Sequence, residues 1–470
     1  MTELSDINLD FLPADRKGIY IVGGTVRDLM LDRQPADIDL ALEGETNRIA
    51  AAIAEKCKGR VIDLGNKGFA LLRVASPSIT VDLTPLAGQT IEDNLRQRDF
   101  TINAMAYDVE SGRLVDCTGG RRDLQKKTIR MVSDSVFSKD PARLVRAYRL
   151  AAAFQFRITS DTHAAIGRSR HLTGTVAGER IWTELLKLFD TPASAATVRD
   201  MAADGLLTSI YPELEPAVGC RQNVFHQFDV FEHSLRTYER LETLLAEAET
   251  RFAALVPARE LAGLVANGAL LKYAALLHDA GKPATRTVDA CGRVRFSGHA
   301  GRGAAIADRI SRRLRLSNWQ RETAVAVIRN HIRPLFLFRA VQNGTLPQRG
   351  MIRFFNHCKA LTLPIVVHTM ADILAKRKAL QQRDESFIAF CDRLMANYAD
   401  FRHRQSQGQP LINGHDLIKV FGLFPAPRFK GILRRVDERR LCGELSTRQE
   451  ALEWVKNHLA SRRGKDGQRT

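Results

Sequence analysis

The chain has 470 residues, 44% of them hydrophobic, which is enough for two to four domains with cores of their own. Lys and Arg outnumber Asp and Glu by 70 to 53, and the net charge of +17 favours a polyanionic partner such as nucleic acid over a surface that is merely well solvated. The seven cysteines show no CxxC spacing and indicate neither a disulfide framework nor a cysteine zinc site. The N-terminus is not of the signal type and no stretch of about 18 apolar residues runs uninterrupted, so we expect a cytoplasmic protein without a membrane segment.

The first part of the chain combines short strands with helices. Apolar and alternating runs predict strands at 18–22, 37–42, 60–64, 69–74 and 79–83. Helical patterns fall between them at 25–32 and 47–56. These segments predict a small mixed α/β domain that ends near residue 125.

From about Asp140 onward the pattern is helical and strand signals almost vanish. Helices are expected at 142–154, 179–190, 195–205, 232–252, 270–279 and 303–313, and the basic terminus 460–470 is expected to be unstructured. Linker-like stretches at 190–192, 211–219 and 405–410 divide this part into a neck, a body and a tail. We therefore expect an α+β chain of four domains, with the bounds 1–125, 126–220, 221–400 and 401–470.

A pair of carboxylates stands in the second predicted strand. Residues two apart on a strand point to the same face, so Asp37 and Asp39 present their carboxylates side by side while Ile38 and Leu40 enter the core. Two like charges held together require a cation, and hard oxygen ligands suit Mg²⁺ shared with substrate phosphates. The pattern predicts a metal site for nucleotidyl transfer, although such a pair by itself is more often solvated surface. A further strand carboxylate, Asp82, is a candidate third acidic group near the metals, although a structural or peripheral role is expected for it.

A double glycine precedes this pair. Gly23 and Gly24 lack a Cβ, so the backbone can approach a ligand, and the N–H groups that open the following helix can receive a phosphate. Arg27 would add a charge-assisted contact to the same phosphate. Alone, this segment reads equally well as an ordinary tight turn.

Together, the glycine turn and the carboxylate strand resemble the nucleotidyltransferase superfamily of DNA polymerase beta. A second block, Glu92 to Ala106 (EDNLRQRDFTINAMA), is similar to the "RRDFTxNAMA" signature of the bacterial and eukaryotic class of tRNA nucleotidyltransferases and of bacterial poly(A) polymerases. The resemblance implies a polymerase-beta-like palm as the head, with Asp37 and Asp39 as catalytic magnesium ligands. It also implies nucleotide contacts from Gly23, Gly24, Arg27, Arg98, Asp99 and Asn103. Gln97 departs from the first arginine of the family's pair.

A third block, Phe137 to Ala151 (FSKDPARLVRAYRLA), resembles the family's "EDxxRxxRAxRF" helix. In the family, the acidic residue and first arginine of this helix serve as a protein template for the incoming base, which implies that role for Asp140 and Arg143. A carboxylate accepts from the amino group that C and A share, and a guanidinium donates to ring acceptors. Arg146 and Arg149 are expected nearer the nucleotide and its phosphates. Lys139 replaces the usual glutamate before Asp140.

The body carries a second constellation of histidines and aspartates, which resembles the HD phosphohydrolase superfamily in its spacing. The expected metal ligands are His233, His278, Asp279, His299, His331 and Asp372. Imidazole and carboxylate together suit Mn, Fe, Ni or Co as well as Mg²⁺, with ligands enough for two ions. Lys282, after Gly281, would contact phosphate. The other histidines, His226 and His368 among them, show no comparable arrangement and are expected to be surface or core residues, with His226 and His415 the most open to another role.

The whole chain is therefore identified as similar to a tRNA nucleotidyltransferase that adds C, A or both of the terminal CCA to tRNA from CTP and ATP. The tail segment 411–433 resembles the family's C-terminal region, which implies a grip on tRNA or, equally, simple packing against the body. A poly(A) polymerase shares all three head motifs. The sequence also leaves room for a metal phosphohydrolase that acts through the HD body, and for a tRNA-binding chaperone without activity.

Overall fold

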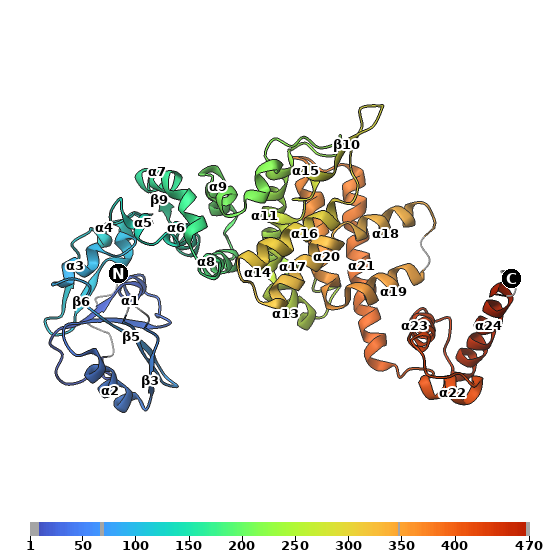
Figure 1. The fold of residues 1–470 in the computed structure, drawn as a ribbon, viewed down its shortest axis with the longest axis horizontal. Coiled ribbons are helices and arrows are strands. Elements are labelled where there is room, and N and C mark those ends of the chain that lie inside the picture. The colour runs from blue at the N-terminus through green and yellow to red at the C-terminus, as the bar shows by residue number, and fades with distance from the viewer. Residues whose placement is uncertain (1–8, 66–69, 346–347, 467–470) are drawn as a thin grey trace. The chain divides into compact units, whose positions relative to one another are not determined.

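The computed structural model describes residues 9–65, 70–345 and 348–466. The chain divides into two compact units, Met1–Pro212 and Glu213–Thr470 (Figure 1). The first unit contains a sheet with helices and the second is almost entirely helical, which confirms the predicted α+β class. The finer division into four domains stays a prediction. All seven cysteines are free, as expected.

A seven-stranded sheet forms the head of the first unit, in the order β3-β4-β5-β2-β1-β6-β7. Its strands are β1 (Ile19–Val22), β2 (Ile38–Leu42), β3 (Arg60–Asp63), β4 (Leu72–Ala75), β5 (Thr80–Pro85), β6 (Ala106–Asp108) and β7 (Arg113–Val115). Strands β2 and β5 are parallel, whereas the other neighbouring pairs are antiparallel. The predicted strands 18–22, 37–42, 60–64 and 79–83 fall on β1, β2, β3 and β5. The predicted strand 69–74 corresponds to β4 in its second half, and its first residue lies outside the described residues.

Helices α1 (Gly24–Met30), α2 (Thr46–Cys57), α3 (Ile91–Arg96) and α4 (Gly120–Gln125) complete the head. One apolar cluster joins the sheet to α3 and to the segment after it, and consists of Val22, Ala41, Ile91, Leu95, Ala104 and Ala106. Burial of this cluster fixes the end of β1, which the glycine turn follows, next to β2, at whose start the carboxylates lie.

The neck of the first unit follows the head and is mostly helical. It contains α5 (Val136–Lys139), α6 (Arg143–Phe154), α7 (Ser160–Ser169), α8 (Gly178–Asp190), α9 (Ala195–Ala203) and α10 (Leu206–Ile210), with a two-stranded ladder of β8 (Thr128–Ile129) and β9 (Arg157–Ile158). Helices α6 and α8 pack against each other. Helix α8 buries Ile181, Leu185 and Leu188 at the spacing of an amphipathic helix.

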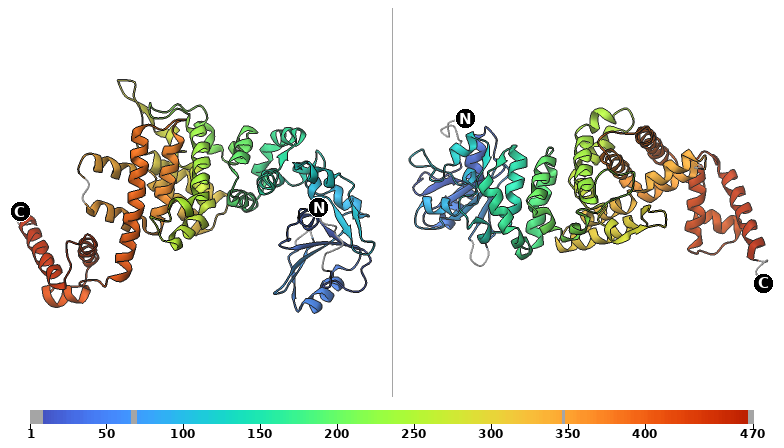
Figure 2. Two further views of the ribbon diagram at one scale, coloured as in Figure 1. Left: turned by 180° about the vertical axis from the view of Figure 1, so that it is seen from behind. Right: turned by 90° about the horizontal axis from the view of Figure 1, so that it is seen from above.

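The second unit begins with a helical body. Its main helices are α11 (Val230–Ala246), α12 (Ala248–Arg251), α13 (Ala258–Ala266), α14 (Gly268–Leu277), α16 (His299–Arg313), α17 (Asn318–Asn330), α18 (Arg333–Gln342), α19 (Gln348–Cys358), α20 (Thr362–Ala375) and α21 (Gln382–Gln407). Helices α11, α14, α17 and α20 lie together, with α16 against α17 (Figure 2). A hairpin of β10 (Arg286–Val288) and β11 (Val294–Phe296) follows the short helix α15 (Lys282–Thr285) and was not expected from the sequence.

Helix α20 is the most apolar element of the body. The helical stretch Arg349–Ala375 is long and apolar enough to cross a membrane by length and composition, and 78% of its most apolar window is buried inside the protein. Packing against α11, α17 and α21 accounts for that burial. Such a composition is the one expected of a central core helix.

The tail consists of α22 (Gly414–Phe421), α23 (Arg428–Leu441) and α24 (Arg448–Asp466) around a small apolar core of its own. It contacts the body through α23, which packs on α19 and α21. Helix α24 continues to Asp466, so most of the terminus expected to be unstructured is helical, and 467–470 lie outside the described residues.

Candidate active site and candidate metal centre

The two carboxylates of the head lie at the start of β2. Asp37 precedes the strand, and Asp39 stands in it directly opposite Asp82 of the parallel strand β5. Arg73 of β4 forms a bidentate ion pair with Asp82, with Nε–Oδ1 and Nη2–Oδ2 distances of 2.7 and 2.8 Å, and lies 3.8 Å from Asp37 Oδ2. The structure thus brings three carboxylates to one edge of the sheet, with Arg73 neutralising part of their charge.

Thr25 connects the glycine turn to this carboxylate strand. The backbone N–H of Asp39 donates to Thr25 Oγ1 at 2.8 Å, and the Thr25 hydroxyl donates to the carbonyl oxygen of Asp37 at 3.3 Å. The Thr25 side chain is buried, so these bonds hold α1 and β2 in a fixed register. The sequence analysis did not single out this residue, although its place between the glycine pair and Arg27 is a local signal.

Gly23 and Gly24 have different reasons to be glycine. Gly23 has a φ of +69°, and a Cβ there would overlap Nη1 of Arg98 and come within 3.6 Å of Asp39 Oδ2. Gly24 opens α1, and a Cβ there would lie 3.4 Å from Arg27 Nη2 and 3.7 Å from Asp39 Oδ2. The turn therefore lies directly against the carboxylate and two guanidinium groups, as the motif predicts.

The electrostatics of the carboxylate site favour a bound cation. Burial raises the pKa of Asp39 to about 6, Arg98 opposes that rise, and the neighbouring Asp82 and Asp37 add to it. The same burial lowers the pKa of Arg98. The donor set of clustered carboxylate oxygens fits Mg²⁺, which prefers such ligands and removes the mutual repulsion of these charges.

A chain of hydrogen bonds that ends in an ion pair links the head to the neck helices. Arg27 Nη1 donates to Asn103 Oδ1 at 2.6 Å, and Asn103 Nδ2 donates to Asp99 Oδ1 at 3.0 Å. Asp99 Oδ2 then accepts from Arg146 Nη1 at 3.2 Å. Burial alone would raise the pKa of Asp99, but Arg146, the Asn103 amide and the backbone N–H of Phe100 lower it. The expected nucleotide-binding residues Arg27, Asp99, Asn103 and Arg146 are therefore brought together.

Glu184 of α8 completes this chain and was missed from the sequence. Its two oxygens accept from Arg146 Nε at 2.9 Å and from Arg149 Nε at 2.5 Å. Glu184 occupies a buried position of the apolar stripe formed by Ile181 and Leu185. An acidic residue on an apolar stripe signals a buried basic partner, and that signal was present in the sequence.

Asp140 and Arg143, the expected base-selecting residues, lie at the beginning of α6. Arg143 Nε is 3.7 Å from Asp140 Oδ2, and Arg143 Nη2 donates to the Gln97 carbonyl oxygen at 3.4 Å. Arg180 of α8, which the sequence analysis did not name, donates to Asp140 Oδ2 at 2.8 Å. The two side chains are therefore neighbours, and each is held by a further partner.

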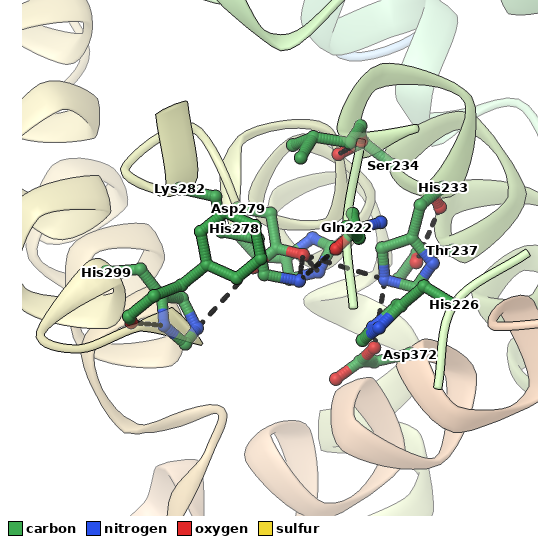
Figure 3. Close-up of polar contacts among 12 residues, drawn as sticks. Gln222, His226, His233, Ser234, Thr237, His278, Asp279, Lys282, His299 and Asp372 are labelled. Carbon is green, nitrogen blue, oxygen red and sulfur yellow. Dashed lines mark hydrogen bonds and ion pairs between the residues drawn. The ribbon is translucent and has the colours of Figure 1, made fainter. Parts of the chain in front are cut away.

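The histidines and aspartates expected in the body also come together, around the carboxylate of Asp279 (Figure 3). Nε2 of His278 and Nε2 of His233 lie 3.0 and 3.6 Å from Asp279 Oδ2. Nε2 of His299 and Nε2 of His331 lie 3.6 and 3.9 Å from its Oδ1. Asp372 Oδ1 is 3.0 Å from His233 Nε2. These six residues come from α11, the end of α14, α16, the end of α17 and α20.

Three of these histidines are oriented in the same way. The Nδ1 atoms of His278, His299 and His331 lie 2.9, 2.8 and 2.6 Å from the carbonyl oxygen three residues earlier in the chain. Donation of Nδ1–H to that oxygen leaves Nε2 with its lone pair toward the aspartates, which is the usual arrangement of metal-bound histidine. Backbone carbonyl groups thus orient all three histidines.

Burial and charge at this centre also fit a metal. Burial lowers the pKa of His331 to about 3 and lowers that of His233, which favours the neutral imidazole form that metal binding requires. Burial opposes ionisation of Asp279, but His278 and Lys282 lower the pKa of its carboxyl well below the usual range. His278 Nε2 lies 3.0 Å from Asp279 Oδ2, and both residues are buried. An ion would bind both atoms, and the mixed imidazole and carboxylate donors suit a divalent transition metal.

Two further histidines join this cluster. His368 stands one helical turn before Asp372 on α20, and its ring lies 5.2 Å from that of His278. His226, from the segment before α11, forms with His233 and Asp372 a group whose ligand atoms lie within 4.8 Å of one another. From the sequence, His226 was noted as open to another role and His368 was not. His368 lies four residues before Asp372 on a helix, so both side chains face the same side, and this spacing was a signal in the sequence.

A cavity of about 1120 Å³ opens above the centre. Asp279, His299, His331 and Asp372 lie at its wall, together with His226. Basic residues gather around it, namely Lys282, Arg293, Arg295, Arg339, Lys376, Arg377 and Arg383. Lys282 Nζ lies 2.6 Å from both Asp279 Oδ2 and Gln222 Oε1. Such a basic cavity over a metal centre is suited to phosphorylated compounds.

Comparisons with known proteins match both the head and the body of the chain. The poly A polymerase head domain matches residues 19–130, the "Probable RNA and SrmB- binding site of polymerase A" matches 155–218, and the HD domain matches 230–337. The CCA-adding enzyme of Thermotoga maritima, solved in complex with tRNA, has a TM-score of 0.62 at 21% identity, covering 94% of this chain and 91% of that one. Fold and site thus define a nucleotidyltransferase head joined to an HD-type body.

Two relatives extend the match over nearly the whole chain. The A-adding tRNA nucleotidyltransferase of Deinococcus radiodurans is 32% identical over 458 residues, which cover 94% of this chain and 96% of the relative. The CC-adding tRNA nucleotidyltransferase of Thermus thermophilus is 31% identical over 460 residues, covering 94% of each. The chain belongs to the family of tRNA nucleotidyltransferases.

Proposed function

We propose that the head transfers nucleotides from CTP and ATP to the 3′ end of tRNA, adding C, A or both of the terminal CCA. One observation carries this proposal. Asp37 and Asp39 lie beside a glycine turn and the guanidinium of Arg98, so that metal-binding oxygens and phosphate-binding groups meet at one edge of the sheet. Names of the nearly full-length relatives support the choice of tRNA as the acceptor.

Asp37 and Asp39 would hold Mg²⁺, which when bound activates the terminal 3′-hydroxyl and neutralises the triphosphate. Gly23 and Gly24 let the phosphates approach the backbone, and Arg27 and Arg98 contact them with fixed positive charge. Asp99, Asn103 and Glu184 position the guanidinium groups of Arg27, Arg146 and Arg149. The side chains supply no nucleophile, because the acceptor hydroxyl attacks the α-phosphorus and pyrophosphate leaves.

Selection of the base falls to Asp140 and Arg143 in this proposal. The Asp140 carboxylate accepts from the amino group common to cytosine and adenine, whereas U and G offer no donor at that place. Arg180 donates to the same carboxylate and holds it in position. Lys139 stands where the family has glutamate, and its charge lies next to the template pair.

The four segments expected from the sequence correspond to four tasks in this proposal. Residues 1–125 carry the transfer, 126–220 select the nucleotide, 221–400 form the HD body, and 401–470 bind tRNA through basic residues of α23. The net charge of +17 suits such an acceptor. The enzyme would act in the cytoplasm, where tRNA is processed.

The direct test uses three tRNA transcripts that end before CCA, after C and after CC. Purified protein and Mg²⁺ are supplied with labelled CTP, ATP or both. Each of three results supports the proposal. Extension of every transcript to CCA indicates full CCA addition, extension of only the CC form by one A indicates A addition, and extension of only the first two forms by C indicates CC addition. Long A tracts would overturn it in favour of a poly(A) polymerase.

A second activity is favoured by the HD body. We infer that the HD body hydrolyses phosphoesters in its basic cavity. One or two divalent ions, of Mn, Fe, Ni, Co or Mg, would activate the attacking water there. The residues that would hold them are His233, His278, Asp279, His299, His331 and Asp372. Convergence of these six side chains around Asp279 supports this inference. The test measures phosphate release from nucleoside monophosphates after metal has been removed from the protein with a chelator and each ion has been added back. The absence of release with every metal would contradict a hydrolase activity.

A further inference from the structure

The histidine-rich centre of the body contains two sets of metal-ligating residues that have no member in common. One consists of Asp279, His299 and His331, and the other of His226, His233 and Asp372. Within each set, the ligand atoms lie within 4.8 Å of one another. His278 belongs to two further groups that overlap both sets, so it can complete the coordination of either ion.

His226 has the orientation of a ligand. Its Nδ1 lies 2.9 Å from the side-chain Oδ1 of Asn223, three residues earlier. The backbone carbonyl oxygens that lie next to Nδ1 of His278, His299 and His331 have the same place relative to those rings. Donation of Nδ1–H to Asn223 leaves Nε2 free to bind a metal. The ring packs edge to face on His233, with 5.1 Å between centroids (Figure 3).

The segment that carries His226 is attached to the helix that carries Asp372. The Gln227 N–H donates to the Lys376 carbonyl oxygen at 2.9 Å, and Arg377 Nη2 donates to the Phe225 carbonyl oxygen at 2.8 Å. These bonds on either side of His226 hold its ring over the end of α20. A residue held this firmly from both flanks is preorganised for coordination.

We propose that His226 is a metal ligand and that the centre holds two divalent ions, one on His226, His233 and Asp372 and the other on Asp279, His299 and His331. This inference rests on the proposed metal-dependent role of the HD body. Two dications against two carboxylates leave the centre positive, which favours a phosphorylated ligand in the cavity. His226 then lies at the cavity wall, where the ion it holds is open to that ligand.

The test measures metal content in the full chain carrying Asp37→Asn and Asp39→Asn, which removes the head site. Each protein is loaded with Co²⁺, dialysed, and analysed by mass spectrometry of the metal and by absorption spectroscopy. The key variant is His226→Phe, which keeps a ring against His233 but removes the ligand nitrogen. The matched control is His415→Phe, at an exposed histidine of the tail.

We expect two ions per chain in the parent and in the control, and one in His226→Phe. Asn223→Ala, which leaves the imidazole in place, should weaken binding of the second ion about 10- to 100-fold. Bound Co²⁺ should also protect His226 from diethylpyrocarbonate. Unchanged stoichiometry and spectrum in His226→Phe would overturn this inference and leave the HD metal centre intact, whereas a parent chain that binds no Co²⁺ would overturn both.

Discussion

Gly23→Ala separates the chemical from the structural role of the glycine turn. The residue has a φ of +69°, where an L side chain is strained, and its new Cβ would overlap Arg98 Nη1. Backbone strain of this kind costs about 1–3 kcal/mol of folding free energy. The overlap also displaces the Arg98 guanidinium, and the loss of its proposed contact with the triphosphate, worth about 1.5–3 kcal/mol for a hydrogen bond to a charged group, corresponds to a rate loss of about 10- to 150-fold.

Gly112→Ala is the matched control, because Gly112 also has a φ of +69° but a Cβ there would meet only Tyr107 Oη, at an ordinary 3.7 Å. Both variants should be destabilised in thermal unfolding. Only Gly23→Ala should lose kcat/KM for incorporation of CMP or AMP into tRNA. A catalytic role of the glycine turn is refuted if Gly23→Ala keeps the parent rate, or if Gly112→Ala loses activity to the same degree.

Three further predictions follow from individual contacts. Thr25→Val removes both hydrogen bonds between α1 and β2, so incorporation should fall about tenfold or more, while Thr25→Ser should retain most activity; equal activity of the two would contradict the role of the hydroxyl. Glu184→Gln weakens the ion pairs of Glu184 with Arg146 and Arg149, so the KM for nucleotide should rise. Glu179→Gln, on the same helix, is the control, and an unchanged KM in Glu184→Gln would argue against the role of this carboxylate. The pKa of Asp39 is raised to about 6, so the folded chain binds this proton more tightly than the unfolded chain, and the carboxylate form costs stability above about pH 6. Mg²⁺ requires that carboxylate, so thermal stabilisation by Mg²⁺ should be lost as pH falls through about 6, and a pH-independent effect would be inconsistent with binding at Asp39.

The sequence predicted those features of the site that depend on residues close to one another in the chain. The strand alternation around Asp37 and Asp39 and the turn at Gly23 are local, and local geometry fixes which way these groups point. The arginines of α6 were likewise expected on one stripe, and Arg146 and Arg149 do share one partner.

The identity of that partner depends on how helices pack, which sequence spacing does not contain. Glu184 lies 38 residues after Arg146 and meets it only because α6 and α8 pack together. Asp82 meets Asp39 because β5 returns parallel to β2, a register set by the whole sheet. His226 and His368 reach the HD centre for the same reason, through the packing of α11, α14 and α20.

Nucleotidyl transfer in the head and the proposed metal chemistry of the body belong to separate sites. Measuring tRNA extension and phosphate release side by side in Asp39→Asn and in His278→Ala tests this separation. We expect Asp39→Asn to abolish extension and keep phosphate release, and His278→Ala to do the reverse. Extension that survives Asp39→Asn, or that disappears in a folded His278→Ala chain, would contradict it.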